Sequence, residues 1–390
     1  MPALTAPVSP SVTRSIAHGL KSIGAGAVWA TVGTVFNQGS TLASNIWIAN
    51  LLGKTRFGEF AIVLATVQAA ASLASLGIGY TTTRYVSEWR HRDLKRAGEL
   101  LGLFSRVSWL SAVVAALLLA AASSGLASDA LKAPALGPSL LIAAITTVFT
   151  VRNGYLTGAL YGLEAFRSIG INGIVSGTGY LALTVLGGVW GGVRGAAWGL
   201  LASAVLQCAS LSIALHFARV KAAIQKGAAT FADESELLIR FAVPAALSGL
   251  STVPVLWAVQ AILARSPQGY DNLAVYAAGL NLLAMVLFAP AVLNGVAMAW
   301  INRTHVLDGD TAYRHAMRAN VYTNAAIVCV ALVATVAIGP LLLGLYGRDF
   351  RTGYAALALL LIAALPETLT NALYQSIQRR QRIWQGLLAI

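Results

Sequence analysis

The stretch LGLFSRVSWLSAVVAALLLAAASSGL, Leu101–Leu126, decides the fold class of this chain. It contains a single charged side chain, Arg106. The hydrocarbon core of a bilayer is about 30 Å thick and is crossed by roughly 20 apolar helical residues. Because lipid offers no partners to backbone polar groups, this stretch is expected to cross the membrane as a helix.

The same pattern recurs along most of the chain and predicts ten membrane spans. These are Ile23–Leu51, Phe57–Thr83, Leu101–Leu126, Pro138–Tyr161, Ile169–Val189, Gly195–Phe217, Leu237–Ala264, Leu273–Ile301, Tyr322–Leu345 and Tyr354–Ser376. None shows the alternation of a β-barrel strand. Only 11% of the residues are charged, whereas soluble domains average about 25%. The predicted fold class is an all-α polytopic membrane protein.

The distribution of basic residues predicts the orientation. With a cytoplasmic N-terminus, 18 of the 27 Lys and Arg residues fall in cytoplasmic connectors and seven in external ones. The positive-inside rule therefore favours this orientation. The net charge of +13 reflects the excess of basic residues in the cytoplasmic connectors. Anionic lipid headgroups are expected partners, and nucleic acid is not.

The longest polar connector divides the chain into two helical lobes. The predicted regions are a cytoplasmic segment at 1–22, an N-lobe of six spans at 23–218, a cytoplasmic linker at 219–236, and a C-lobe of four full spans at 237–390. Prolines inside C-lobe spans, such as Pro340, are expected to bend their helices. The final run IWQGLLAI is too short to cross. We expect it to be the start of an eleventh helix in a truncated C-lobe, or a short interfacial segment.

Two arginines lie inside spans and are the leading candidates for a binding site. Arg106 and Arg152 should each cost about 2.5–3.5 kcal/mol on insertion, so each is expected to face a watery cavity or a partner. Both fall toward the cytoplasmic side, where they could capture an anionic headgroup. The alternative is that the two arginine side chains extend to the nearby membrane–water interface.

Uncharged and acidic side chains within the spans supply further candidates. Asn37 and Gln38 in the first span and Asn153 in the fourth suit sugar hydroxyls, although contacts between helices use the same residues. Glu59 and Glu367 could bind a coupling proton or Na⁺, or could pair with an arginine.

Motifs for enzymatic chemistry are missing from the sequence. It contains no GxSxG, Walker or HExxH motif, and its histidines are dispersed. Cys208 and Cys329 lie inside predicted spans, which argues against a disulfide or thiolate metal site. No catalytic residue, metal or cofactor is expected.

Three segments resemble the oligosaccharide flippases, or polysaccharide biosynthesis proteins, of the multidrug/oligosaccharidyl-lipid/polysaccharide exporter superfamily. They are ANLLGKTRFGEFAIVLATVQAAASLASLGIGYTTTRYVSEWRHRD (Ala49–Asp93), TGALYGLEAFRSIGINGIVSG (Thr157–Gly177) and IRFAVPAALSGLSTVPVLW (Ile239–Trp257). The resemblance rests on dispersed glycines, aromatics and arginines, and it extends from about Ile23 to the end.

The resemblance implies two six-helix lobes around a central cavity in a bacterial inner membrane. It also implies alternating access that carries polyprenyl-diphosphate-linked oligosaccharide to the outer leaflet, together with polysaccharide assembly proteins as partners. On this hypothesis Arg152 and Arg106 hold the diphosphate, and Asn37, Gln38 and Asn153 contact sugar. The chain stops short of the usual twelve spans. It also lacks the first-span arginine of lipid II flippases, which disfavours that substrate.

Two other functions stay open at this point. A MATE-type cation antiporter of the same superfamily would need acidic residues in its cavity. A membrane glycosyltransferase or polysaccharide polymerase would need a large external catalytic loop, whereas the predicted external connectors are short.

Overall fold

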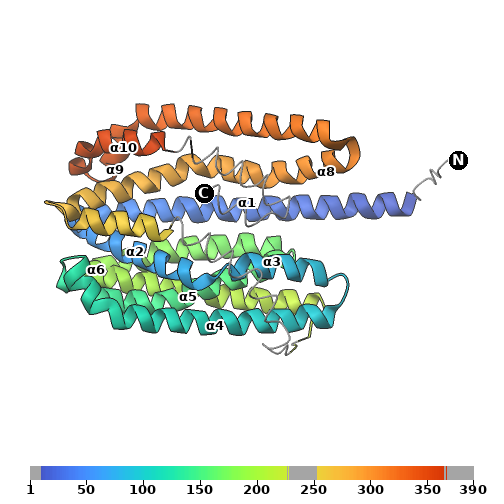
Figure 1. Cartoon of the computed structure of the whole chain (residues 1–390), viewed down its shortest axis with the longest axis horizontal. Coiled ribbons are helices and arrows are strands. Elements are labelled where there is room, and N and C mark those ends of the chain that lie inside the picture. The colour runs from blue at the N-terminus through green and yellow to red at the C-terminus, as the bar shows by residue number, and fades with distance from the viewer. Residues whose placement is uncertain (1–9, 226, 228–252, 364–365, 367–390) are drawn as a thin grey trace.

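The computed structural model describes residues 10–225, 227, 253–363 and 366, which are almost entirely helical (Figure 1). The helices are α1 (Pro10–Leu52), α2 (Lys54–Ser75), α3 (Ile78–Trp89), α4 (Leu94–Gly125), α5 (Gly137–Gly162), α6 (Phe166–Lys221), α8 (Gly269–Ala337), α9 (Gly339–Tyr346) and α10 (Tyr354–Ile362). A further helix covers Val253–Ala264. Short turns of π- or 3₁₀-helix are η1 (Leu126–Ala130), η2 (Pro134–Leu136) and η3 (Arg348–Gly353).

Six segments among the described residues are helical, long and apolar enough to cross a membrane. They are Lys54–Ser75, Leu94–Ala130, Pro134–Gly162, Phe166–Lys221, Gly269–Phe288 and Ala319–Ala337. The 56 residues of α6 contain a break at Gly191 and Gly192, where Gly192 has φ 57°. The break separates the fifth predicted span from the sixth. The chain is thus a polytopic helical protein, while the count of ten spans and the cytoplasmic N-terminus stay predictions.

The segment α8 contains two antiparallel arms. Val286 and Val328 belong to one apolar cluster, yet 42 residues of straight helix would separate them by about 60 Å. Figure 1 shows the α8 ribbon running along the bundle and then returning beside itself. These arms correspond to the eighth and ninth predicted spans.

Two predicted spans are interrupted. The span Phe57–Thr83 is not one helix, because Leu76 (φ 45°) and Gly77 (φ 64°) adopt left-handed conformations that end α2 and precede α3. The span Tyr322–Leu345 breaks between α8 and α9, and Pro340 lies in the first turn of α9. Proline lacks an amide donor and clashes with the preceding turn, so the expected effect of Pro340 is confirmed.

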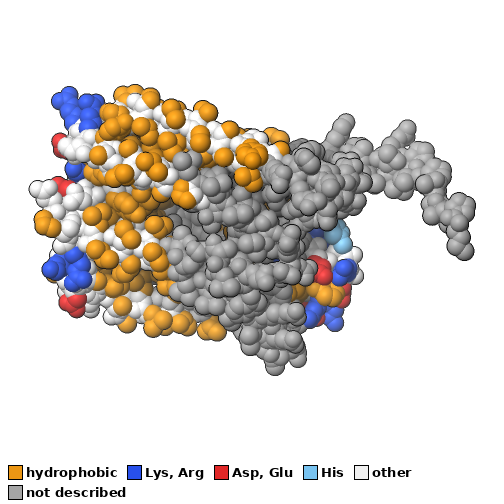
Figure 2. Space-filling view, turned by 45° about the horizontal axis from the view of Figure 1, so that its top comes forward, with side chains coloured by type: hydrophobic (Ala, Val, Ile, Leu, Met, Phe, Trp, Pro, Cys, Tyr) orange, Lys and Arg blue, Asp and Glu red, His pale blue; other side chains and the backbone are white. Residues whose placement is uncertain are grey.

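The apolar side chains are arranged as a membrane protein requires. Figure 2 shows Lys and Arg side chains at both ends of the bundle and hydrophobic side chains between them. Large hydrophobic side chains between the ends are exposed, including Leu117 on α4 and Val330 on α8. A hydrocarbon environment accounts for this exposure.

The two halves of the chain meet at the end that contains the α1–α2 turn. There Phe57 of α2 packs against Tyr346 and Phe350, with ring centroids 5.9 Å and 6.0 Å away. The same cluster includes Ile48 of α1 and Leu282 of α8. Apolar packing therefore closes this end of the space between the halves.

Polar contacts reinforce this closure at its rim. The Asn50 amide donates a hydrogen bond to the Leu345 carbonyl oxygen. The Lys54 ammonium group donates to the carbonyl oxygen of Asp349 at 3.2 Å, and the Thr55 hydroxyl donates to Asp271. Each contact joins the α1–α2 turn to the second half. In the predicted orientation this end is external.

Candidate functional site

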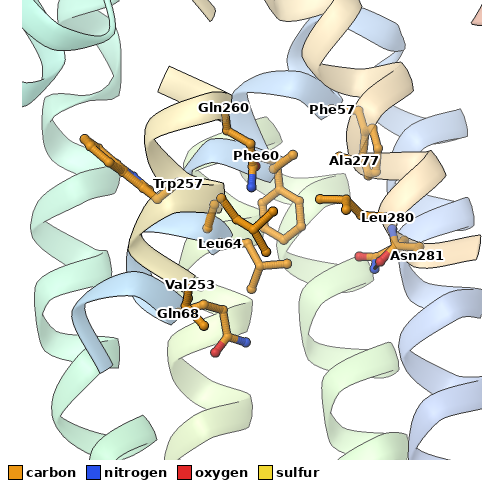
Figure 3. Close-up of a pocket in the computed structure, with 14 residues that line it drawn as sticks. Phe57, Phe60, Leu64, Gln68, Val253, Trp257, Gln260, Ala277, Leu280 and Asn281 are labelled. Atoms are coloured by element: carbon orange, nitrogen blue, oxygen red, sulfur yellow. Dashed lines mark hydrogen bonds between the residues drawn. The ribbon is translucent and has the colours of Figure 1, made fainter. Parts of the chain in front are cut away.

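A cavity of about 190 Å³ lies where the two halves meet (Figure 3). Its walls come from α1, α2, the helix Val253–Ala264 and α8. Pockets that enclose a whole small ligand measure about 300–1,000 Å³. This cavity is therefore large enough for one part of an extended substrate.

The polar groups of the cavity are carboxamides. Asn45, Gln68, Gln260 and Asn281 line it, and its described lining includes no charged side chain. Each carboxamide offers both hydrogen-bond donors and an acceptor. Gln260 is 7% exposed and extends between Trp257 and Phe60 (Figure 3). Within the described part of the chain, neither Gln68 nor Gln260 uses its side chain in a hydrogen bond, so both remain available to a ligand.

Aromatic rings contribute to the apolar part of the same lining, together with aliphatic side chains. The Trp257 indole N–H donates to the Thr66 hydroxyl oxygen at 2.9 Å, and this hydroxyl donates to the Ile62 carbonyl oxygen at 2.7 Å. These two bonds hold the indole in one orientation. Phe57 and Phe60 are buried in the opposite wall. The cavity thus combines one anchored, partly exposed indole with neutral hydrogen-bonding groups.

A small polar network connects the cavity wall across the two halves. The Asn45 amide donates to the Asn281 side-chain oxygen at 3.2 Å. The oxygen of Asn45 accepts a hydrogen bond from the Tyr180 hydroxyl at 3.4 Å. Asn45 is only 2% exposed, so this network contributes to how α1 and α8 are held together.

We expect Asn45→Leu and Asn281→Leu to be coupled in their effects on stability. The hydrogen bond between them should appear as an interaction energy of about 0.6 kcal/mol, with an upper limit near 1.7 kcal/mol, in a double-mutant cycle. Unfolding equilibria of the four proteins in mixed micelles measure this energy. A parallel cycle of Asn45→Leu with Asn153→Leu should be additive, because Asn153 lies outside the cavity lining and shares no hydrogen bond with Asn45. Additivity in both cycles would contradict the assigned contact.

The predicted arginines lie elsewhere, along the contact between α4 and α5. Arg152 is half-buried, and its guanidinium donates to the Ser105 carbonyl oxygen at 3.3 Å. Arg106 is exposed on α4, and its Nε donates to the Gly102 carbonyl oxygen at 3.4 Å. The structure brings the two helices together but places neither arginine in the cavity lining.

The predicted amides hold helices of the first half together. Asn37 accepts a hydrogen bond from the Ser176 hydroxyl at 3.1 Å, which joins α1 to α6. Asn153 donates to the Ala204 carbonyl oxygen at 3.2 Å and the Gln207 side chain at 3.0 Å. Gln38 is half-buried on α1. None of the three lines the cavity, so their role in sugar binding stays a prediction.

The structure describes only one of the two acidic candidates. Glu59 is half-buried near the start of α2, where it interacts electrostatically with Arg56 and Tyr270. Glu367 lies outside the described residues, as do the final run predicted to begin an eleventh helix and linker residues 228–236. Ion coupling by either carboxylate stays a prediction.

Sequence reasoning did not select Gln68, Gln260 or Asn281. Each is an isolated amide in an apolar helix, which is the same signal of an intramembrane polar group that selected the arginines. The amides were overlooked because their insertion cost is smaller. Their proximity also depends on contacts between helices far apart in the chain.

Comparisons with known proteins identify the family of the chain. Residues 23–304 match the family described as polysaccharide biosynthesis protein. The chain is 24% identical over 366 residues to the EPS I polysaccharide export inner membrane protein EpsE of Ralstonia solanacearum, covering 93% of this chain and 81% of that protein.

Solved transporters share the fold. One is an inward-facing multidrug resistance MATE family transporter of the MOP superfamily, with TM-score 0.75 and 15% identity over 92% of this chain and 86% of that one. Another is a MOP superfamily transporter from Pyrococcus furiosus, with TM-score 0.66 and 15% identity over 94% and 84%.

The fold and the relatives indicate a multi-pass transport protein of the bacterial inner membrane. The chain belongs to the polysaccharide biosynthesis protein family. This confirms the family resemblance seen in Ala49–Asp93, Thr157–Gly177 and Ile239–Trp257. It also confirms the predictions of a transporter and of an inner-membrane location.

Proposed function

We propose that the protein moves polyprenyl-diphosphate-linked oligosaccharide from the inner to the outer leaflet by alternating access. The observation that carries this proposal is the amide-lined cavity between the two halves. Sugar hydroxyls need both donors and acceptors, which carboxamides supply without charge. The anchored indole of Trp257 suits the apolar face of a sugar ring. The export role in the name of the Ralstonia relative supports the same substrate class.

In this proposal Gln68, Gln260 and Trp257 contact one part of the glycan while the lipid tail stays in the membrane. Asn37, Gln38 and Asn153 are further candidate sugar contacts, and Glu59 and Glu367 are candidate ion-coupling groups. Arg152 and Arg106 are candidate ligands for the diphosphate. An inside-negative potential favours outward movement of this anion by about 2.3 kcal/mol per charge per 100 mV.

Transport by the purified full chain in proteoliposomes tests the proposal. The probe is a polyprenyl diphosphate carrying a radiolabelled oligosaccharide, and its arrival at the opposite leaflet is measured with a membrane-impermeant glycosidase. We expect transfer that depends on time and on protein. Polyprenyl diphosphate without glycan should move more slowly, because it lacks the groups that the cavity binds.

Two results would overturn the proposal. Gradient-driven uptake of an organic cation without glycan transfer would indicate a cation antiporter. Release of free polyprenyl diphosphate during incubation would indicate a glycosyltransferase or polymerase. Vesicles containing the Ala277→Phe variant provide the control for leakage, because its cavity is obstructed.

A further inference from the structure

Arg152 occupies an unusual environment for a charged group in an apolar helix. It lies ten residues before Gly162, the last residue of α5, which corresponds to about 15 Å. Its guanidinium carbon is 4.5 Å from the ring centre of Tyr155 and 5.3 Å from that of Trp109. The two rings flank a planar cation, and cation–π attraction helps to hold the guanidinium between them.

Among the described residues, Arg152 uses only part of its hydrogen-bonding capacity. A guanidinium has five N–H donors, and the described part of the chain shows one hydrogen bond, to the Ser105 carbonyl oxygen. No ion pair among the described residues includes Arg152. A half-buried guanidinium with free N–H groups is a favourable ligand for an oxyanion, which it can bind through two parallel hydrogen bonds.

Two more cations lie along the same contact between helices. Arg106 follows Ser105, the residue that receives the hydrogen bond from Arg152. Arg219 at the end of α6 interacts electrostatically with Tyr155, and its buried Nε makes no hydrogen bond within the described structure. We call Arg106, Arg152 and Arg219, with the rings of Trp109 and Tyr155, the arginine seam.

The arginine seam borders an exposed apolar face of α4. Trp109 is 43% exposed, and Leu110 and Leu117 on α4 are more than half exposed. Figure 1 shows α4 at the edge of the bundle farthest from the returning arm of α8. The seam is separate from the amide-lined cavity, whose lining includes none of its residues.

We propose that the arginine seam binds a lipid-borne phosphate group from the surrounding membrane. Arg152 supplies the fixed, aromatic-flanked guanidinium, and Arg106 and Arg219 supply positive charge on either side. The phosphate belongs either to an anionic phospholipid or to a polyprenyl diphosphate. The second source rests on the proposed function and would make the seam a docking site for the substrate before its glycan enters between the halves.

Native mass spectrometry of the full chain in a neutral detergent tests the proposal. The probes are farnesyl diphosphate and dioleoylphosphatidylglycerol, with farnesol and dioleoylglycerol as phosphate-free controls. We expect the phosphate-bearing lipids to bind at least about tenfold more tightly than the controls, and Arg152→Gln to remove this preference. Arg152→Lys should restore part of it, because lysine keeps the charge but not the planar donor pair.

A matched control is Arg194→Gln, which removes the same charge from an exposed side chain beyond the α6 break. Its phosphate binding should equal that of the wild type. Equal binding by the wild type and Arg152→Gln, or an equal loss in Arg194→Gln, would overturn the proposal. If Arg152→Gln fails to fold, Arg106→Gln at an exposed position should still weaken binding several-fold, and unchanged binding there would count against the seam.

The two lipid sources and the two proposals can be told apart. Preference for the diphosphate by about tenfold or more assigns the seam to the lipid carrier, and equal affinity assigns it to phospholipid. Both outcomes support a lipid-phosphate site. Phosphate binding without glycan transport by the wild type would leave the seam intact and remove the proposed function. Glycan transport by the wild type without seam-dependent phosphate binding would overturn the proposal for the seam and leave the proposed function intact.

Discussion

Replacing Ala277 by phenylalanine should weaken glycan binding and transport about 5- to 150-fold, which follows from an overpacking cost of about 1–3 kcal/mol in the occupied state. Ala277 is half-buried on α8 and lines the cavity between the halves. A phenyl ring there would fill much of a cavity of about 190 Å³. Initial rates of glycan transfer in proteoliposomes, together with thermal unfolding of the same preparation, measure the effect.

Ala284→Phe is the matched control for this prediction. Ala284 is exposed on the same helix and does not line the cavity, so the added ring should meet lipid and leave transport unchanged. Unchanged transport by Ala277→Phe would show that the glycan does not enter this cavity. Equal loss in both variants would point to a general effect of aromatic residues on α8.

Replacing Gly58 by alanine should lower the free energy of unfolding by about 1–3 kcal/mol and reduce transport, because α2 and α8 would be forced apart. A methyl group at Gly58 would overlap the Tyr270 carbonyl oxygen and would lie 2.9 Å from its carbonyl carbon. It would also lie 3.3 Å from the backbone nitrogen of Ala274. Backbone atoms of a packed helix cannot turn away as the end of a side chain can.

Gly39→Ala is a control that should change the free energy of unfolding in the opposite direction. Gly39 is a helical glycine of α1, and an added methyl group there would meet nothing within 4 Å. Alanine should therefore stabilise the protein by about 0.4–1 kcal/mol, since it restricts the unfolded chain without a clash. Chemical unfolding in mixed micelles measures both variants. If Gly58→Ala left stability unchanged or raised it, the contact between α2 and α8 would not be as tight as the structure indicates.

The membrane class and the approximate positions of most helices follow from local properties of the chain. Apolar length determines whether a segment can cross a bilayer, which is why Leu101–Leu126 falls within α4 and η1. Conformational breaks were harder to locate. The break at Pro340 could be expected from the sequence, because proline lacks a backbone N–H donor. The break at Leu76 and Gly77 could not, because these residues lie inside an uninterrupted apolar run.

The candidate site was less predictable than the helices. Insertion cost selected Arg152 correctly as an unusual residue, but it does not say which side of a helix faces lipid, a neighbouring helix or a cavity. The structure places Arg152 at the contact of α4 and α5, and it places Asn37 and Asn153 in contacts between helices. Direction around a helix depends on its neighbours, and those neighbours are distant in sequence.

The sequence by itself determined that this protein is a helical membrane protein of the polysaccharide biosynthesis family, because hydrophobic length and dispersed family residues are properties of the linear chain. Only the tertiary structure decided that Gln68 of α2 shares a cavity with Gln260 and Asn281, and that Arg152 is remote from it. Residues separated by about two hundred positions meet only through helix packing. The energy of that packing is spread over many small contacts, so no single residue of the sequence indicates it.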